Sequence, residues 1–216
     1  MTDHSTLPHT EVVVFDGFDD LDAIGPLEVL TEAGFPTRVV RPAGHATTVH
    51  SAHGLVIDVD AELGAAHHDA ARPLPDATPD LVIVPGGGWL DGGPGVRDQC
   101  EGGLPAAIAA LHDAGTVVAS VCTGAMLLGR AGLLSGRPAV TNRNALEDLA
   151  AAGADVRGDA RVVDDGSIVT GGGPAAGLDV AIRLVARFAG DEAGRQAAAR
   201  LEHEPIGPVL VTVATT

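Results

Sequence analysis

Cys122 is the residue of this sequence whose type and position best suit covalent chemistry. It follows the apolar run TVVASV, which is typical of a buried strand, and a helical pattern begins directly after it. At the N-terminus of a helix, unpaired N–H groups and the helix dipole stabilise an anion, and thiol pKa values fall from about 8.5 to between roughly 3.5 and 7.5. The sequence therefore predicts a nucleophilic thiolate at position 122. A buried cysteine that packs as a small apolar residue remains the alternative interpretation.

A group of three aspartates supplies the candidate acid or base. Asp19, Asp20 and Asp22 precede or open a predicted helix, and helix capping explains at least two of them. Asp22 differs because the apolar residues Ala23 and Ile24 follow it. A carboxyl group that shares a pocket with a thiol can transfer a proton to and from it.

The glycines at positions 86 to 88 end another predicted strand, and they allow backbone N–H groups to approach a reacting atom closely. Together with the N–H of Cys122 or Thr123, those of Gly87 and Gly88 are candidates for an anion hole. A tight turn that needs positive φ explains the same glycines, and the two interpretations are compatible. Trp89, the single tryptophan, is either an aromatic wall of the pocket or a packing residue.

Patterns that bind metals or nucleotides are missing from the sequence. The nine histidines, including His50 and His53 and the pair His67–His68, form no HExxH arrangement, and no CxxC is present. No Walker A sequence occurs, and the glycines at 171–173 do not fit a dinucleotide fingerprint. We therefore expect neither a metal nor an organic cofactor. Cys100 lacks a setting like that of Cys122 and is interpreted as structural.

The overall charge limits the partners. A formal net charge of −16, with 13 Lys and Arg against 29 Asp and Glu, argues against binding to nucleic acid or to an anionic membrane. The sequence has no apolar run of about 18 residues, as a transmembrane helix requires. Its polar first ten residues do not resemble a signal peptide, so we expect a cytoplasmic protein with two free thiols.

Strand patterns alternate with helical patterns along the chain, which predicts an α/β fold with a mainly parallel sheet covered on both faces. We expect the carboxyl ends of the strands to bring together three segments: 16–26, 85–89 and 121–124. Strands are predicted at 11–16, 37–44, 47–54, 55–63, 80–88, 116–121, 138–141 and within 161–172, and helices at 19–34, 104–114, 144–153 and twice after 174. Pro26 is expected in the first turn of its helix.

A single domain is predicted over residues 11–205. Residues 1–10 are interpreted as a flexible leader, 206–216 as a C-terminal tail, and the stretch 64–79, rich in Ala, Pro, Asp and His, as a surface loop.

Four motifs in this chain resemble those of the DJ-1/PfpI superfamily, and within it the isonitrile hydratase-like branch. The resemblance spans residue 11 to about residue 205. The motifs are LDAIGPLEVL (21–30), IVPGGG (83–88), SVCTGAMLLGRAGLLSGRPAVT (120–141) and IVTGGGPAAGLDVA (168–181).

The resemblance implies a flavodoxin-like three-layer sandwich, a homodimer and a cysteine nucleophile elbow. Isonitrile hydratases add water to R–NC to give an N-substituted formamide, without a metal or an organic cofactor. By this resemblance Cys122 would form a thioimidate, Asp22 would act as acid or base, and Thr123 would orient the reacting groups. Backbone N–H groups near Gly87 and Gly88 would complete the pocket.

The chain departs from relatives at two places. Relatives with peptidase or glyoxalase-like activity often carry His directly after the cysteine, whereas Thr123 stands here, which argues against a Cys–His protease. Asn142 and Arg143 occupy the place of a His–Trp pair common in hydratase-like members. Arg143 either meets an anionic or carbonyl-bearing substrate or forms a solvent-facing pair with Glu147. With Trp89 and Gly173, these residues complete the predicted substrate-binding set.

Three functions remain open on the sequence. The leading one is a cofactor-independent, cysteine-dependent hydratase or lyase acting on a small molecule. The second is a non-catalytic, redox-sensing or protective protein. The third is another enzyme of the family, such as a glyoxalase-like, amidase-like or tailoring enzyme of secondary metabolism.

Overall fold

Short apolar runs form the strands of a central seven-stranded sheet in the computed structural model, which describes residues 7–65 and 78–212. Every residue of the strands at 10–13, 81–84 and 168–171 is buried, as a sheet covered on both faces requires. The strands are β1 (Thr10–Val13), β2 (Thr37–Val40), β5 (Leu81–Val84), β6 (Val117–Ser120), β9 (Val162–Asp164), β10 (Ile168–Gly171) and β11 (Val209–Val211).

The order of the strands across the sheet is β11-β9-β10-β6-β5-β1-β2. Neighbours among β2, β1, β5, β6 and β10 pair in parallel, and in chain order these five strands follow the 2-1-3-4-5 order of flavodoxin-like sheets. Only the β9–β10 pair is antiparallel in this described sheet. The direction of the crossovers reverses between β1 and β5, which is where open sheets bind ligands beyond their carboxyl ends.

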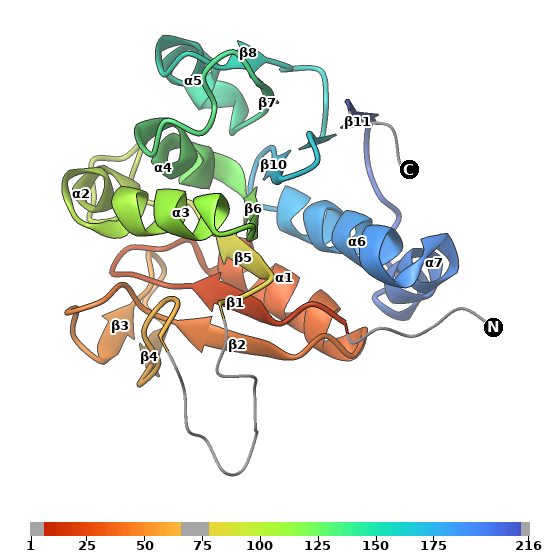
Figure 1. Cartoon of the computed structure of the whole chain (residues 1–216), viewed down its shortest axis with the longest axis horizontal. Helices are drawn as coiled ribbons and strands as arrows, with labels where there is room; N and C mark the ends of the chain where they lie inside the picture. Colours follow the sequence, from red (N-terminus) through yellow and green to blue (C-terminus); the bar gives the residue numbers. More distant parts are fainter. Residues whose placement is uncertain (1–6, 66–77, 213–216) are drawn as a thin grey trace.

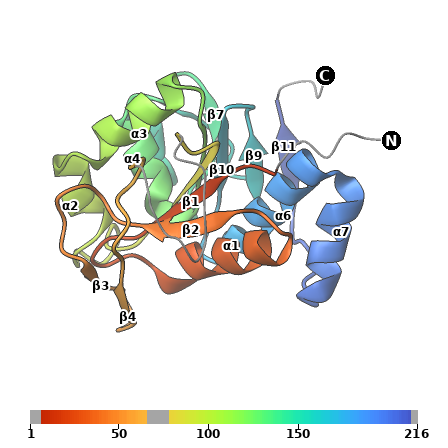
Figure 2. The same ribbon diagram turned by 60° about the horizontal axis from the view of Figure 1, so that its bottom comes forward.

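Helices cover both faces of the sheet (Figures 1 and 2). On one face lie α1 (Asp20–Glu32), α6 (Ala176–Ala189) and α7 (Asp191–Arg200), and α6 packs against both of the others. On the opposite face, α2 (Val96–Glu101), α3 (Leu104–Asp113) and α4 (Ala125–Arg130) pack together. The predicted α/β fold with a mainly parallel central sheet is therefore confirmed.

Smaller elements lie around this sandwich. A hairpin is formed by β3 (Thr48–His50) and β4 (Val56–Asp58), and a separate parallel pair by β7 (Pro138–Ala139) and β8 (Asp155–Val156), next to α5 (Leu146–Ala151). The strand predicted at 138–141 therefore exists but lies outside the central sheet. None of the helices in the described ranges is long and apolar enough to cross a membrane.

Three local predictions need correction. Thr10, assigned to a flexible leader, is the first residue of β1 and is fully buried. Val209–Val211, assigned to a C-terminal tail, form the edge strand β11 and pair in parallel with β9. Three residues are too few to show the alternation that identifies a strand. Pro26 lies in the middle of α1 rather than in its first turn. The helix accommodates it beside α6, where a Cβ on Gly177 would lie only 3.2 Å from Pro26 Cδ. Most of the loop predicted at 64–79 lies outside the described residues.

Gly124 permits the closest contact between the turn that follows β6 and the end of β5. Its φ of −55° is ordinary, but a Cβ there would lie 2.3 Å from the carbonyl oxygen of Val84. We expect Gly124→Ala to lower the free energy of unfolding by about 1–3 kcal/mol, because backbone has to move to accept the methyl group. Urea denaturation followed by circular dichroism measures this loss.

Gly103→Ala is the matched control. Gly103 has a φ of −81°, and nothing lies within 4 Å of a Cβ built on it. The free energy of unfolding of Gly103→Ala should stay within about 0.5 kcal/mol of the value for the unchanged protein. Equal losses in the two variants would contradict a steric role for Gly124.

Candidate active site

The backbone of Cys122 adopts a left-handed conformation between β6 and α4. Val121 is extended, Cys122 has a φ of 54°, and a short 3₁₀ turn, η1 (Cys122–Gly124), leads into α4. A non-glycine residue in this region costs about 1–3 kcal/mol and persists only where its surroundings enforce it. Thr141 contributes to that enforcement, since its Oγ1 donates a hydrogen bond of 2.7 Å to the carbonyl oxygen of Cys122.

Asp22 lies in the first turn of α1 with its side chain fully buried. Asp19 caps the helix and accepts a hydrogen bond from the N–H of Leu21, so Asp22 is free of the capping role. Instead its Oδ2 accepts a hydrogen bond of 2.9 Å from the N–H of Gly86, which follows β5. Only glycine fits at position 86, because a Cβ there would lie 2.8 Å from that same carboxylate oxygen.

Thr123 joins the loop after β5 to the cysteine turn. Its Oγ1 accepts a hydrogen bond of 3.1 Å from the N–H of Gly87, and its side chain is buried. The N–H groups of Gly86 and Gly87 are thus engaged by side chains, which corrects the prediction that the N–H of Gly87 lines an open anion hole. Gly88, with a φ of 67°, approaches the backbone of Pro94 instead. The three segments expected to converge do converge here.

The carboxyl group of Asp22 has a strongly raised pKa. Burial is the largest cause, and the negative charge of Asp19 adds to it, while hydrogen bonds from Gly86 and the Cys122 thiol oppose it, and the resulting pKa is about 8. Within the described ranges, Asp22 Oδ1 has no hydrogen-bond partner of normal geometry. At neutral pH this carboxyl group is therefore mostly protonated.

The thiol of Cys122 also has a raised pKa, contrary to the prediction of a stabilised thiolate. Burial is the main cause and the adjoining Asp22 the next, and together they outweigh hydrogen bonds from Asn142 and the N–H of Thr123 to give a pKa of about 12. The side chain is only 5% exposed, so loss of solvation exceeds the effect of the short helix. The resting site is thus a neutral pair, a carboxylic acid beside a thiol.

A cavity of about 760 Å³ brings three of the predicted residues together, since Asn142, Arg143 and Gly173 all line it, whereas Cys122, Thr123 and Asp22 are not among its lining residues. Asn142 connects it to the sulfur, because its Nδ2 donates a hydrogen bond of 3.3 Å to Cys122 Sγ. The sequence indicated Asn142 only through the resemblance, and it gave no signal for the contribution of Thr141.

Trp89 does not line that cavity. Its Nε1 donates a hydrogen bond of 2.7 Å to Asp148 of α5, and the guanidinium of Arg97 lies 4.3 Å from the centre of its ring. These contacts connect the loop after β5 to α5 and α2, as the packing interpretation expects. Within residues 7–65 and 78–212, no three His, Cys, Asp or Glu side chains are grouped as metal ligands. His67 and His68 lie outside those ranges.

Comparisons with known proteins relate the whole arrangement to one family. A family model described as "DJ-1/PfpI family" matches residues 10–187 of this chain. The chain is 40% identical over 141 residues to an uncharacterized protein in the cpoL 5′ region of Streptomyces lividans, covering 62% of this chain and 88% of that one. It is 37% identical over 129 residues to an isonitrile hydratase of Pseudomonas putida, covering 60% of this chain and 54% of that one. The match thus spans about half the length of that hydratase.

Solved structures give the same result for the fold. A ThiJ/PfpI family protein of Pseudomonas syringae superposes with a TM-score of 0.77 at 26% identity, covering 96% of this chain and 80% of that one. Drosophila melanogaster DJ-1beta superposes with a TM-score of 0.75 at 22% identity, covering 93% of this chain and all of that one, and this likeness concerns the fold alone.

The raised pKa of Asp22 predicts a pH-dependent stability difference for Asp22→Asn. The folded protein keeps this carboxyl group protonated up to a pH of about 8, whereas in the unfolded chain it ionises near a pH of about 3.9. The stability that Asp22 contributes is therefore fully present below about pH 4 and is lost as the pH rises to about 8.

Relative to the unchanged protein, Asp22→Asn should gain stability by up to about 1.4 kcal/mol per pH unit across this window. Its amide oxygen can still accept the Gly86 N–H. Urea unfolding of both proteins at a series of pH values measures the difference between their free energies of unfolding. Ionisable groups that the two proteins share contribute equally to both values and cancel in the difference. A difference that is constant with pH, or that falls as the pH rises, would contradict a raised pKa.

Proposed function

The model of the DJ-1/PfpI family matches residues 10–187, so the chain belongs to that family, and we propose that it is a cofactor-independent hydratase. The proposed reaction is the addition of water to isonitriles. The observation that carries the proposal is the buried pair formed by Cys122, in its enforced left-handed conformation, and Asp22. A neutral acid and a neutral thiol side by side suit a reaction in which the sulfur and a proton both add to one uncharged carbon atom. The 37% identity to the isonitrile hydratase supports this substrate class.

In the first step of the proposed reaction, Cys122 Sγ forms a bond to the terminal carbon of R–NC. Asp22 donates its proton to that carbon and receives the thiol proton. The product is the thioimidate R–N=CH–S–Cys, and the carboxyl group is protonated again. No separate thiolate has to form, which fits a thiol whose pKa is raised to about 12.

In the second step, water adds to the thioimidate carbon. Asp22 donates its proton to the nitrogen and takes one from the water, which gives R–NH–CH(OH)–S–Cys. Cleavage of the C–S bond then releases R–NH–CHO, and the hydroxyl proton returns to the sulfur through Asp22. The Gly86 N–H, held 2.9 Å from Asp22 Oδ2, stabilises the carboxylate whenever it forms.

A redox-sensing role fits these features less well. Peroxide reacts with the thiolate form of cysteine, and sensor thiols have low pKa values and are accessible to solvent. Cys122 is 5% exposed and its pKa is raised.

A homodimer, as the resemblance implies, is part of the proposal, together with the cytoplasmic location expected from the sequence. Exposed apolar side chains on α1 and on the β3–β4 hairpin, including Leu21, Ile24 and Val56, offer surface that a second copy would bury.

Cys122→Ser and Asp22→Asn should each lower kcat/KM for isonitrile hydration by at least about 10²–10³, because each removes a group that touches the reacting carbon or its proton. Formamide formation from cyclohexyl isonitrile, followed by mass spectrometry, measures the loss. Circular dichroism establishes that the variants are folded.

Cys100→Ser is the matched control, since Cys100 is partly exposed and lies outside the site. It should retain full activity. Unchanged turnover in Cys122→Ser would refute the covalent mechanism, and absence of turnover in the unchanged protein would refute the assignment to isonitriles.

A further inference from the structure

The cavity lined by Asn142, Arg143 and Gly173 is large enough for much more than an isonitrile group. At about 760 Å³ it extends from the segment after β7 to the segments before β9, after β10 and before β11. Its lining includes Thr141, Asn142, Arg143, Asp159, Arg161 and Gly173. Polar and apolar groups share this lining, so the group that it accepts has polar character.

Asn142 lies between this cavity and the sulfur. Its Nδ2 donates to Cys122 Sγ at 3.3 Å, and its Oδ1 accepts a hydrogen bond of 3.0 Å from the N–H of Asn144. Hydrogen bonds therefore hold both the nitrogen and the oxygen of the amide. Asn142 lies on the cavity wall, and its amide nitrogen contacts the sulfur of Cys122. Asn142 is thus a residue that touches both the cavity and the nucleophile.

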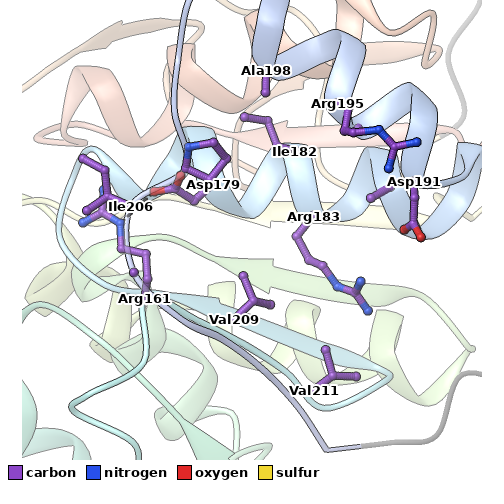
Figure 3. Close-up of a pocket in the computed structure, with 14 residues that line it drawn as sticks. Arg161, Asp179, Ile182, Arg183, Asp191, Arg195, Ala198, Ile206, Val209 and Val211 are labelled. Carbon is purple, nitrogen blue, oxygen red and sulfur yellow. Dashed lines mark hydrogen bonds and ion pairs between the residues drawn. The ribbon is translucent and has the colours of Figure 1, made fainter.

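The arginines that line the two cavities of this region, other than Arg143, are paired with acidic side chains. Arg161 binds Asp179 at 2.7 Å, and it lines both this cavity and a second one of about 450 Å³ between α6, α7 and β11 (Figure 3). Arg183, which lines only the second cavity, binds Asp164 at 2.9 Å. Arg195 there binds Glu192 at 2.6 Å. Each of these charges is thus already neutralised.

Arg143 is exposed, and its guanidinium makes no ion pair with any described residue, Glu147 included. The ion pair with Glu147 considered from the sequence is therefore absent, although both residues face the solvent. Asp159 is the one carboxylate of the cavity lining, and it too forms no ion pair with Arg143 in the described part of the chain. In a chain of net charge −16, this exposed guanidinium without an acidic partner among the described residues gives the cavity wall a local preference for an anion.

We propose that Arg143 selects substrates that carry a carboxylate on the group attached to the isonitrile nitrogen. A guanidinium binds a carboxylate through two parallel N–H···O bonds, which fixes orientation as well as position. The carboxylate lies in the cavity at Arg143 while the isonitrile carbon reaches Cys122 past Asn142. This inference rests on the proposed isonitrile chemistry for the reaction, but the anion site itself does not depend on it.

The test compares 3-isocyanopropanoate with its uncharged amide as substrates of the unchanged protein, Arg143→Gln and Arg143→Lys. The unchanged protein should prefer the carboxylate in kcat/KM. Arg143→Gln should lower kcat/KM for the carboxylate about tenfold or more, mainly through KM, and leave the amide within about twofold. Arg143→Lys should restore part of the preference, because it keeps the charge but not the paired hydrogen bonds.

Arg195→Gln is the control for net charge. It removes the same charge from an exposed ion pair outside this cavity and should leave the ratio of the two substrates unchanged. Asp159→Asn should raise the preference for the carboxylate, since it removes a like charge from the cavity.

A binding measurement separates failure of this inference from failure of the proposed function. Calorimetry with Cys122→Ala, which cannot react, measures the affinity for N-formyl-β-alanine and for its amide. Binding of the carboxylate that depends on Arg143, without turnover of any isonitrile, would refute the reaction and retain the anion site. Turnover without preference for the carboxylate, or a preference that survives in Arg143→Gln, would overturn the inference and retain the reaction. Absence of both binding and turnover would overturn both.

Discussion

The neutral carboxyl group of Asp22, fully buried against the Cys122 thiol, is the constraint on which the rest of the site depends. Burial of an ionised carboxylate without a cationic partner is costly, so this group retains its proton, and its pKa rises to about 8. The thiol next to it is likewise kept neutral, with a pKa of about 12. The thiol and the carboxyl group thus each hold a proton where they meet. This arrangement favours a reaction in which one proton is donated while another is accepted, over a reaction that needs a free thiolate.

Close backbone approach makes this arrangement possible. The N–H of Gly86 binds Asp22, the N–H of Gly87 binds Thr123, and Gly124 packs on the end of β5. Any larger residue at position 86 would displace the carboxylate that the pocket is built around. The sheet order places these contacts at the reversal between β1 and β5, with β6 beside it, so the topology and the glycines together determine where the acid and the thiol meet.

The sequence predicted the alternation of strands and helices and the convergence of its loops because long apolar runs and helix ends are local signals. Cys122 and Asp22 could be singled out from the ends of predicted elements, whereas the role of the Thr123 side chain was indicated only through the family resemblance. The direction of the thiol pKa was predicted wrongly, because burial of Cys122 depends on residues distant in the chain. β11 was missed as a three-residue strand, and the hydrogen bond from Asn142 to Cys122 Sγ depends on two segments that are neighbours only in the folded chain.

The most direct test of the neutral pair is the ionisation of Asp22 itself. Carbon-13 NMR of the side-chain carboxyl resonance, assigned by comparison with Asp22→Asn, reports its protonation as the pH is changed. The account predicts that this resonance titrates near a pH of about 8, together with a second, smaller change when Cys122 ionises at higher pH. A single titration near a pH of about 4, as in an exposed aspartate, would contradict it.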